Sequence, residues 1–266
     1  MIDNIFIPTL GRSDNQITYN NLCDKWKSKT ILVVQEHEAH LYKDYNIQVL
    51  PPHIKSIAPT REWIAQQNIG KIYGVLDDDL KFYRTRMKGE TFDKSKRKMT
   101  DEDFDELENT ICSWLNDDIA VCGLSNAVRP PNIVDEYEDI KSVSQLFFFD
   151  GKKIPVYDIS WNDCIVTEDT HVLLQLTKKG FKSRISNRFR YESAPPAMAG
   201  GCSTFRTIEL QNEANLTLHK LHPGLVRLVE KEVTRGGFAG KTAIHAVIQW
   251  KKAYQTSMLN NLYDSV

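Results

Sequence analysis

Ile72-Tyr73-Gly74-Val75-Leu76-Asp77-Asp78-Asp79 is the stretch that decides the fold of this 266-residue chain. Its first five residues are mostly apolar and include β-branched and aromatic side chains, which predicts a strand over 72–76. Three acidic residues follow directly at the carboxyl end of that strand. The stretch therefore predicts a sheet that presents a cluster of carboxylates at its edge.

Three more strands are predicted upstream, over residues 5–8, 30–35 and 46–50, and the second is nearly continuously apolar, as in a sheet covered on both faces. Helices are predicted over 14–26 and 59–68. This alternation favours an α/β fold with a mostly parallel central sheet flanked by helices. Ligands of such sheets bind at the carboxyl ends of the strands, so Arg12, Glu36 and the Asp triplet are expected at one rim.

Downstream of the Asp triplet, the basic stretch after Tyr83 has no apolar periodicity and is predicted to be a loop. Helices are predicted over 100–115 and 168–179, and strands over 119–124 and 145–150. Residues 194–203 have the composition of a loop, and the tail from 209 is mainly helical in pattern. We therefore expect a catalytic core over 1–206 and a helical C-terminal extension over 207–266, packed on the core.

Composition points to an ordinary globular protein, because 41% of residues are hydrophobic and 26% are charged. The first residues lack the pattern of a secretory signal, and no apolar run is long enough to cross a bilayer, so no membrane association is expected. The five cysteines are scattered and form no CxxC pair, which is typical of reduced thiols in a cytoplasmic protein.

Charge is segregated along the chain although the formal net charge is only -1. Basic residues are dense over 81–98 and 178–190, and acidic residues over 101–108 and 135–139. Charge runs usually form solvated faces. Two basic segments of this density are also compatible with a patch that binds a polyanion. The sequence leaves both readings open.

The Asp triplet is the first candidate site. Crowded carboxylates repel one another, and Mg²⁺ or Mn²⁺ relieves that repulsion because both prefer hard oxygen ligands. Asp77 and Asp79 alternate, so they could converge on one ion while Asp78 turns away. A solvated acidic turn is the alternative. A dehalogenase-type phosphatase fits poorly because Lys81 stands at the last position of its DxDx[TV] motif, and a nucleotidyltransferase fits poorly because no Gly-rich phosphate loop is present.

Glu168 and Asp169 form the second candidate site, at the start of a predicted helix. Acidic residues at that position commonly cap the helix and complement its dipole. A carboxylate there can also act as a general base toward a hydroxyl nucleophile. Seven histidines are scattered along the chain, and the spacing singles out none of those that follow the acidic motifs; we take His245 as the candidate metal ligand.

Four motifs taken in order give the sequence a specific resemblance. They are Ile7-Pro8-Thr9-Leu10-Gly11-Arg12, Val33-Val34-Gln35-Glu36, Pro59-Thr60-Arg61-Glu62-Trp63-Ile64 and Val75-Leu76-Asp77-Asp78-Asp79. With them the sequence resembles a GT-A glycosyltransferase and, more narrowly, the phage TET-associated glycosyltransferases, which modify hydroxymethylated pyrimidines in DNA. The segment from Glu168 to Gly180 resembles the second acidic motif of GT-A enzymes, and Gly200-Gly201-Cys202-Ser203-Thr204 a later Gly-rich segment.

The resemblance implies roles for individual residues. Asp77 and Asp79 match the acidic motif that holds Mn²⁺ or Mg²⁺ and the donor diphosphate, with Asp78 beside them. Asp169 matches the base of inverting members, with Glu168 next to it. The remaining matches are donor-facing positions, at Thr9, Arg12, Glu36 and Arg61.

The resemblance also implies a function. We expect a metal-dependent transferase that uses a UDP-sugar donor and a 5-hydroxymethylpyrimidine in DNA as acceptor, acting in the cytoplasm of an infected bacterium. The two basic segments agree with a DNA acceptor, because protein contacts to phosphates come mainly from Lys and Arg. The alternatives are a GT-A enzyme acting on a glycan, a lipid or a protein, and a non-catalytic module that binds modified DNA.

Overall fold

The computed structural model describes residues 1–90, 95–115, 119–127, 135–193, 207–234 and 238–263. Within these residues it forms a ten-stranded sheet in the order β3-β2-β1-β4-β9-β7-β10-β5-β6, with β8 paired to β10. The strands are β1 (Asn4–Pro8), β2 (Thr30–Val34), β3 (Ile47–Val49), β4 (Ile72–Leu76), β5 (Leu80–Thr85), β6 (Lys96–Lys98), β7 (Ile119–Asn126), β8 (Tyr137–Asp139), β9 (Leu146–Asp150) and β10 (Lys182–Ser193).

The sheet is mostly parallel, as predicted. Strands β3, β2, β1 and β4 pair in parallel, and so do β7 and β10. Strands β9, β5 and β8 run in the opposite direction and pair antiparallel with their neighbours. The carboxyl ends of β1, β4, β7 and β10 therefore meet at one rim, where the antiparallel β9 begins.

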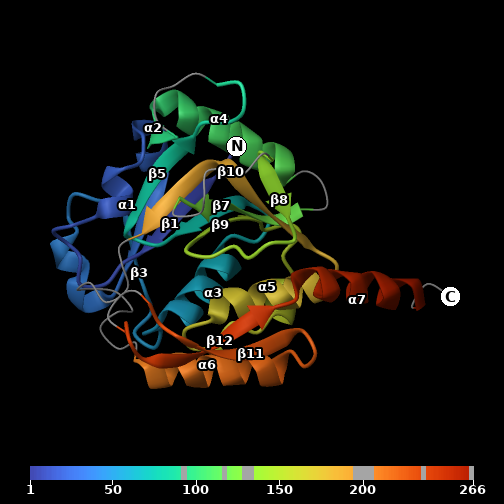
Figure 1. Cartoon of the computed structure of the whole chain (residues 1–266). Coiled ribbons are helices and arrows are strands. Elements are labelled where there is room, and N and C mark those ends of the chain that lie inside the picture. The colour runs from blue at the N-terminus through green and yellow to red at the C-terminus, as the bar shows by residue number, and fades with distance from the viewer. Residues whose placement is uncertain (91–94, 116–118, 128–134, 194–206, 235–237, 264–266) are drawn as a thin grey trace.

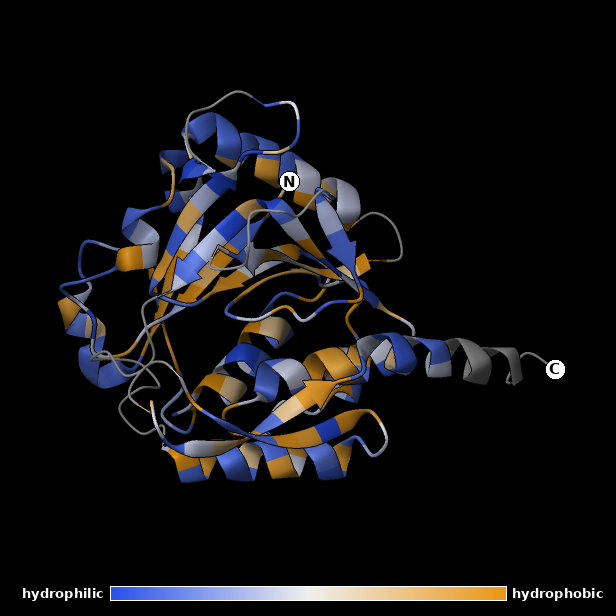
Figure 2. Ribbon diagram, viewed as in Figure 1, coloured by the Kyte–Doolittle hydropathy of each residue, from blue (hydrophilic) through white to orange (hydrophobic). Residues whose placement is uncertain are grey.

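Helices cover both faces of the sheet (Figure 1). On one face α2 (Asp24–Lys27) and α4 (Asp101–Trp114) bury Trp26 and Phe104, whose rings meet edge to face. On the other face α3 (Ile57–Gln67) and α5 (Glu168–Lys178) bury Ile64 and Val172. Figure 2 shows the apolar residues concentrated on the strands between these two layers. The α/β fold with flanking helices is thus confirmed.

The predicted helix over 14–26 is instead two short helices, α1 (Ile17–Asn20) and α2. The chain leaves the helical path because residue Thr18 makes two contacts with the acidic turn after β4, through its backbone N–H and its hydroxyl. Tertiary hydrogen bonds to a functional turn override local helix propensity here.

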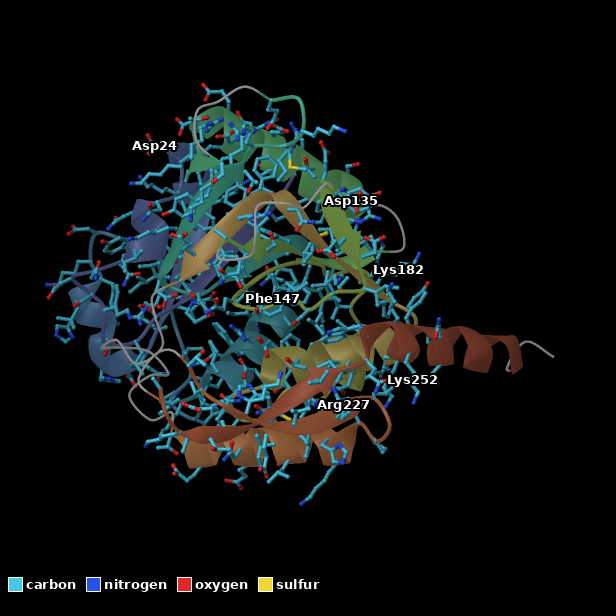
Figure 3. All side chains as sticks on the ribbon, in the orientation of Figure 1. Asp24, Asp135, Phe147, Lys182, Arg227 and Lys252 are labelled. Atoms are coloured by element: carbon cyan, nitrogen blue, oxygen red, sulfur yellow. The ribbon has the colours of Figure 1, made fainter. Side chains whose placement is uncertain are left out.

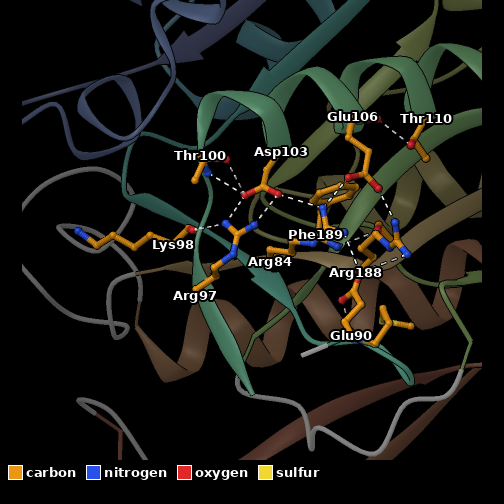
Figure 4. Close-up of polar contacts among 12 residues, drawn as sticks. Arg84, Glu90, Arg97, Lys98, Thr100, Asp103, Glu106, Thr110, Arg188 and Phe189 are labelled. Atoms are coloured by element: carbon orange, nitrogen blue, oxygen red, sulfur yellow. Dashed lines mark hydrogen bonds and ion pairs between the residues drawn. The ribbon is translucent and has the colours of Figure 1, made fainter. Parts of the chain in front are cut away.

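The basic stretch after Tyr83 is not a loop throughout, because β5 extends to Thr85 and pairs with β6. Much of its charge is neutralised by α4. Arg84 lies 2.9 Å from Asp103 and 2.5 Å from Glu106, and Arg97 also pairs with Asp103 (Figure 4). Asp103 is only 3% exposed and forms a capping box with Thr100 at the start of α4. The acidic and basic runs of the sequence are therefore largely partners of one another.

The described C-terminal residues contain α6 (Ile208–Leu221), β11 (Val226–Glu232), β12 (Thr242–Ile248) and α7 (Trp250–Tyr263). The antiparallel pair β11–β12 adds strands to a tail that was expected to be mainly helical. A small apolar cluster joins these elements to α5 through Leu174, Leu218 and Ala253. We keep the division into a core over 1–206 and an extension over 207–266 as a proposal.

Four cysteines among the described residues carry free thiols, and Cys202 lies outside them, as does the Gly-rich segment 200–204. Burial raises the pKa of the Cys122 thiol. None of the helices that the structure describes is both long and apolar enough to cross a membrane.

Gly151 closes the turn after β9 and leaves no room for a side chain. A Cβ atom there would lie 2.2 Å from the Asn68 carbonyl oxygen and 2.8 Å from that of Lys71. Because both are backbone atoms, Gly151→Ala should lower the free energy of unfolding by about 1–3 kcal/mol. Chemical denaturation of the variant measures this loss. Lys220→Ala is the control, because it shortens an exposed side chain on α6 and adds no atom to the interior; an equal loss in both variants would contradict the steric account.

Candidate active site

The Asp triplet follows β4 at the rim of the sheet, and its backbone is held by Thr18. The Thr18 N–H donates to the Asp78 carbonyl at 3.1 Å, and its hydroxyl donates to the Asp77 carbonyl at 2.5 Å. The same hydroxyl accepts from the Leu80 N–H at 2.8 Å. Thr18 is fully buried. The acidic turn is therefore a fixed element, which argues against a solvated acidic turn.

Arg61 joins the two acidic motifs. From α3 its guanidinium reaches Asp77 at 2.7 Å on one side and Glu168 at 2.5 Å on the other. Arg61 is 6% exposed and Glu168 is 5% exposed. The guanidinium also lies 5.2 Å from the ring centre of Phe147, which Figure 3 labels between the sheet and α5. Residues far apart in sequence thus form one buried charged cluster, and Glu168 is not a solvent-facing helix cap.

The cluster of Arg61, Asp77 and Glu168 contains more acidic groups than basic ones. Burial raises the pKa of Asp77 to about 6, against the opposing effect of Arg61, and Asp79, Asp78 and Asp169 raise it further. Burial likewise raises the pKa of Glu168 to about 7, with Arg61 again opposing the shift. One guanidinium is shared between the buried Glu168 and the partly exposed Asp77, so an additional cation nearby would be stabilised.

The oxygen donors of this cluster have the chemistry that a divalent cation such as Mg²⁺ or Mn²⁺ requires. Within the described residues, no three His, Cys, Asp or Glu side chains converge in a group ready to hold a metal ion. The oxygen donors thus have the right chemistry for a metal, but in the described residues they are not gathered into a binding group, and Asp77 is held by Arg61.

A second polar cluster lies on the β1 side of the triplet. Asp78 accepts hydrogen bonds from the Thr9 hydroxyl at 2.8 Å and from Arg12 at 2.5 Å, and Arg12 lies 3.7 Å from Asp79. Gln16 donates to the Thr9 hydroxyl at 3.1 Å. Arg12 and Asp78 lie at one rim, as predicted from strand order, and Thr9 lies with them; the sequence gave no sign of Gln16.

Glu36 lies apart from that cluster as an exposed residue at the start of the 3₁₀ helix η1 (Glu36–Leu41). Glu38, two residues further on, instead holds the loop after β1, because both of its carboxylate oxygens accept from the Gly11 N–H at 3.0 Å. Donor contact by Glu36 stays a prediction, and Glu38 is the acidic residue of this helix that orders the loop containing Arg12.

Asp169 stands next to Glu168 in the first turn of α5 and is partly exposed. Its Oδ1 accepts from the Thr170 N–H at 2.6 Å, and it lies close enough to Asp77 to raise the pKa of that carboxyl. Asp169 is therefore the more accessible acid of the second motif, while Glu168 is engaged by Arg61. That arrangement suits a base that meets a substrate.

His245 lies on β12 with an exposed side chain, opposite Val229 of β11. Its proposed role as a metal ligand stays a prediction. The histidines that do come together are His171 of α5 and His222 after α6, whose Nδ1 and Nε2 atoms are 2.8 Å apart in the interior. His171 also lies 3.5 Å from Asp163. This pair joins the helix of the second acidic motif to the C-terminal elements.

The histidine pair predicts acid-sensitive stability. Burial lowers the pKa of His222 to about 4 and also lowers the pKa of His171, although Asp163 opposes the second shift. An unfolded histidine takes up a proton near pH 6.5, so the stabilisation is complete above that pH and is lost as the pH falls toward 4. We expect a loss of about 1–2 kcal/mol between pH 7.5 and pH 5.

Melting temperatures at the two pH values check this expectation. His222→Gln should flatten the difference, because the amide retains a polar Nε2 atom but does not titrate. His40→Gln is the control, since His40 is exposed on η1. A pH dependence that survives unchanged in His222→Gln would contradict the assignment.

Comparison with known proteins adds a family match. A model of the family described as TET-Associated Glycosyltransferase matches residues 4–198. No curated protein sequence matches the chain.

Among solved structures, TarS residues 1–349 of S. aureus with UDP-GlcNAc is 12% identical, with a TM-score of 0.47 over 82% of this chain and 67% of that one. A longer TarS structure is 14% identical, with a TM-score of 0.46 over 85% of this chain and 40% of that one. A mycobacterial protein is 10% identical, with a TM-score of 0.43 over 92% of this chain and 83% of that one. These likenesses are distant, so the assignment rests on the family match.

Proposed function

Because the chain belongs to the TET-Associated Glycosyltransferase family, we propose that it moves a sugar from a UDP-sugar to the hydroxyl of a 5-hydroxymethylpyrimidine in DNA, with the help of a divalent metal. Membership of the family makes the protein a nucleotide-sugar-dependent glycosyltransferase. The uridine nucleotide, the metal and the DNA acceptor are the proposed parts of this function.

The observation that carries the proposal is the buried bridge from Asp77 through Arg61 to Glu168. A transferase must hold a negatively charged donor and a hydroxyl acceptor within reach of each other. The bridge connects the acidic motif suited to the donor with the acidic motif suited to the acceptor at one rim of the sheet. Asp77 and Asp79 follow the end of β4, and Asp169 lies in the first turn of α5 beside Glu168.

The donor end is assigned to the β1 side of the site. Arg12 and Thr9 lie at the end of β1, where a nucleotide bound at the carboxyl ends of the strands would meet them. Asp77 and Asp79 would hold Mn²⁺ or Mg²⁺, which when bound neutralises charge on the diphosphate leaving group. Arg61 fixes the Asp77 carboxylate and keeps Glu168 beside it.

The chemical step needs one proton acceptor. The acceptor hydroxyl loses its proton to the Asp169 carboxylate as its oxygen bonds to the anomeric carbon of the sugar. The bond from that carbon to the diphosphate oxygen breaks, and its electron pair leaves with UDP. The Thr170 N–H, which donates to Asp169 Oδ1, orients the carboxylate for this step.

The basic residues that support a DNA acceptor are only a part of the segment 81–98 that the sequence indicated. Lys96 pairs with Glu192 and Arg97 with Asp103, so these two charges are engaged within the protein, and Lys94 lies outside the described residues. Lys81 and Lys98 have exposed side chains on the β5–β6 ribbon. They flank Tyr83 on one face, because Lys98 is opposite Tyr83 and Lys81 is two residues away from it.

If that face contacts phosphates, the double variant Lys81→Ala/Lys98→Ala should bind hydroxymethylated duplex DNA less tightly and with a weaker salt dependence. Each lost phosphate contact removes about 0.9 from the slope of log affinity against log salt concentration. Binding measured at several salt concentrations gives this slope. Lys220→Ala/Lys251→Ala is the matched control, because it removes the same charge from exposed positions on α6 and α7. Equal slopes in the two double variants would remove this face from the DNA interface.

The acceptor itself is tested by mass spectrometry of short duplexes. Each duplex carries one 5-hydroxymethylcytosine, 5-hydroxymethyluracil, 5-methylcytosine or unmodified base, and is incubated with a panel of UDP-sugars and Mn²⁺. We expect a mass increase of one sugar only on a hydroxymethylated duplex. Sugar transfer to a glycan, lipid or protein acceptor but to none of the duplexes would replace the DNA acceptor by the alternative class. DNA binding without donor turnover would favour a non-catalytic module.

A further inference from the structure

The chain enters β9 through a segment with an unusual backbone. Ile140 has φ 55° and Gln145 has φ 63°, and they are the two residues other than glycine that have positive φ in the described part of the chain. Left-handed backbone is disfavoured for residues that carry a Cβ atom, and Gly would occupy either position without strain. Residues kept in such conformations cluster at functional sites.

Gln145 touches the acidic motif directly. The Asp77 N–H donates to the Gln145 carbonyl oxygen at 2.7 Å, one step beyond the last strand pair, Leu76 with Leu146. The strained residue therefore lies beside the first aspartate of the triplet. Ile140 instead contacts the start of β10, where its N–H donates to the Ser183 carbonyl at 2.7 Å.

The segment before Gln145 is anchored on the side of the site opposite Arg12. Val143 is 1% exposed and packs so closely on β7 that a Cβ atom at Gly123 would lie 2.4 Å from it. The Ser144 hydroxyl lies 3.3 Å from the Tyr191 hydroxyl of β10. In the sheet order, β1 flanks β4 on one side and β9 on the other. Gln145 thus lies on the β9 side of β4, on the half of the rim away from Thr9 and Arg12.

The Gln145 side chain is half-buried, and its amide makes no hydrogen bond to any other residue that the structure describes. An amide both donates and accepts, so it can bind a hydroxyl or the hydrogen-bonding edge of a base. A fixed, strained position with an amide available for a ligand is what a recognition residue requires.

We propose that Gln145 is a specificity-determining residue that binds the acceptor next to Asp77. This inference rests on the proposed function, because it needs a transferase with a hydroxyl acceptor. It assigns the nucleotide to the β1 side of the Asp triplet and the acceptor to the β9 side. The ligand chemistry is a neutral group that offers both a hydrogen-bond donor and an acceptor, as a hydroxymethylated pyrimidine does.

The test replaces Gln145 by Gly. Gly accepts the left-handed backbone, so the melting temperature of Gln145→Gly should equal or exceed that of the wild type. Loss of the amide should raise KM for the acceptor by about fivefold to tenfold, the effect of one or two hydrogen bonds. KM for the UDP-sugar should stay within twofold. Ile140→Gly is the matched control, because it relieves the same kind of strain away from the Asp triplet and should leave acceptor KM unchanged.

The activity of the wild-type protein is measured first, with each candidate acceptor. If the wild type transfers no sugar, the proposed function fails and the role of Gln145 is not what has been tested. With active wild type, an unchanged acceptor KM in Gln145→Gly would overturn the proposal. A melting temperature of Gln145→Gly below that of the wild type would also overturn the proposal, because Gln145 would then be a structural residue. A rise in KM for the UDP-sugar as large as that for the acceptor would overturn it too, because Gln145 would then contact the donor. Asn also tolerates left-handed backbone and keeps an amide, so Gln145→Asn should recover part of the lost acceptor affinity.

Discussion

Replacing Asp169 by Asn should lower kcat by about 10²–10⁴-fold while donor binding changes little. The amide has nearly the same shape as the carboxylate but cannot accept the proton of the acceptor hydroxyl. Asn also serves well near a helix N-terminus, so the loss cannot come from a missing cap on α5. Steady-state kinetics with saturating acceptor, together with donor affinity measured by calorimetry, check this expectation.

Asp24→Asn is the matched control for this substitution, because Asp24 also occupies the first turn of a helix, is exposed and pairs with Lys27. If Asp169→Asn loses donor affinity by as large a factor as it loses kcat, Asp169 contacts the donor or the metal and is not the base. A loss of stability without a kinetic defect would reduce Asp169 to a helix-capping residue.

The second large effect is expected at the acidic triplet. Asp79→Asn should lower transfer by about 10³-fold and leave the fold intact, because a metal-ligating carboxylate supports several kcal/mol of charge stabilisation on the leaving group. Removing divalent ions from the wild type with EDTA should have the same effect, and Mn²⁺ should restore activity. Circular dichroism and melting temperature confirm that the variant is folded.

Asp78→Asn is the comparison within the triplet. Asp78 binds Thr9 and Arg12, so its loss should raise donor KM more than it changes the response to metal. Full transfer in excess EDTA would rule out the metal-dependent mechanism. If the activities of Asp78→Asn and Asp79→Asn depend on Mn²⁺ concentration in the same way, the two aspartates do not have the separate roles assigned here, donor binding for Asp78 and metal binding for Asp79.

Much of the fold could be read from the sequence because its central strands are apolar and its helices carry clear caps. Strand β4 and its acidic end were located to the residue, and helix α4 begins after Thr100 as its capping pattern predicts. Strands β5 and β10 were missed because their residues alternate with Lys and Arg, which hides the apolar face. The charges that hide them pair with α4 and with one another, and a sequence does not reveal pairings between distant residues.

The site was predictable to the same extent. Motif order brought Arg61, Asp77 and Glu168 forward as candidates, but not the fact that one arginine joins both acidic motifs. Thr18 and Gln16 lie in a region that reads as helix, and only the tertiary structure turns them toward the triplet. Gln145 gave no signal at all, since its distinguishing property is a backbone angle.

The central claim is that the rim around Arg61 transfers sugar to hydroxymethylated DNA. The most direct measurement uses radiolabelled UDP-sugar and a duplex with one hydroxymethylpyrimidine, and counts label retained on the DNA. Wild-type protein with Mn²⁺ should label the hydroxymethylated duplex and leave its unmodified counterpart unlabelled, and EDTA or Asp169→Asn should abolish the signal. Equal label on both duplexes, or label that persists undiminished in Asp169→Asn, would contradict the account.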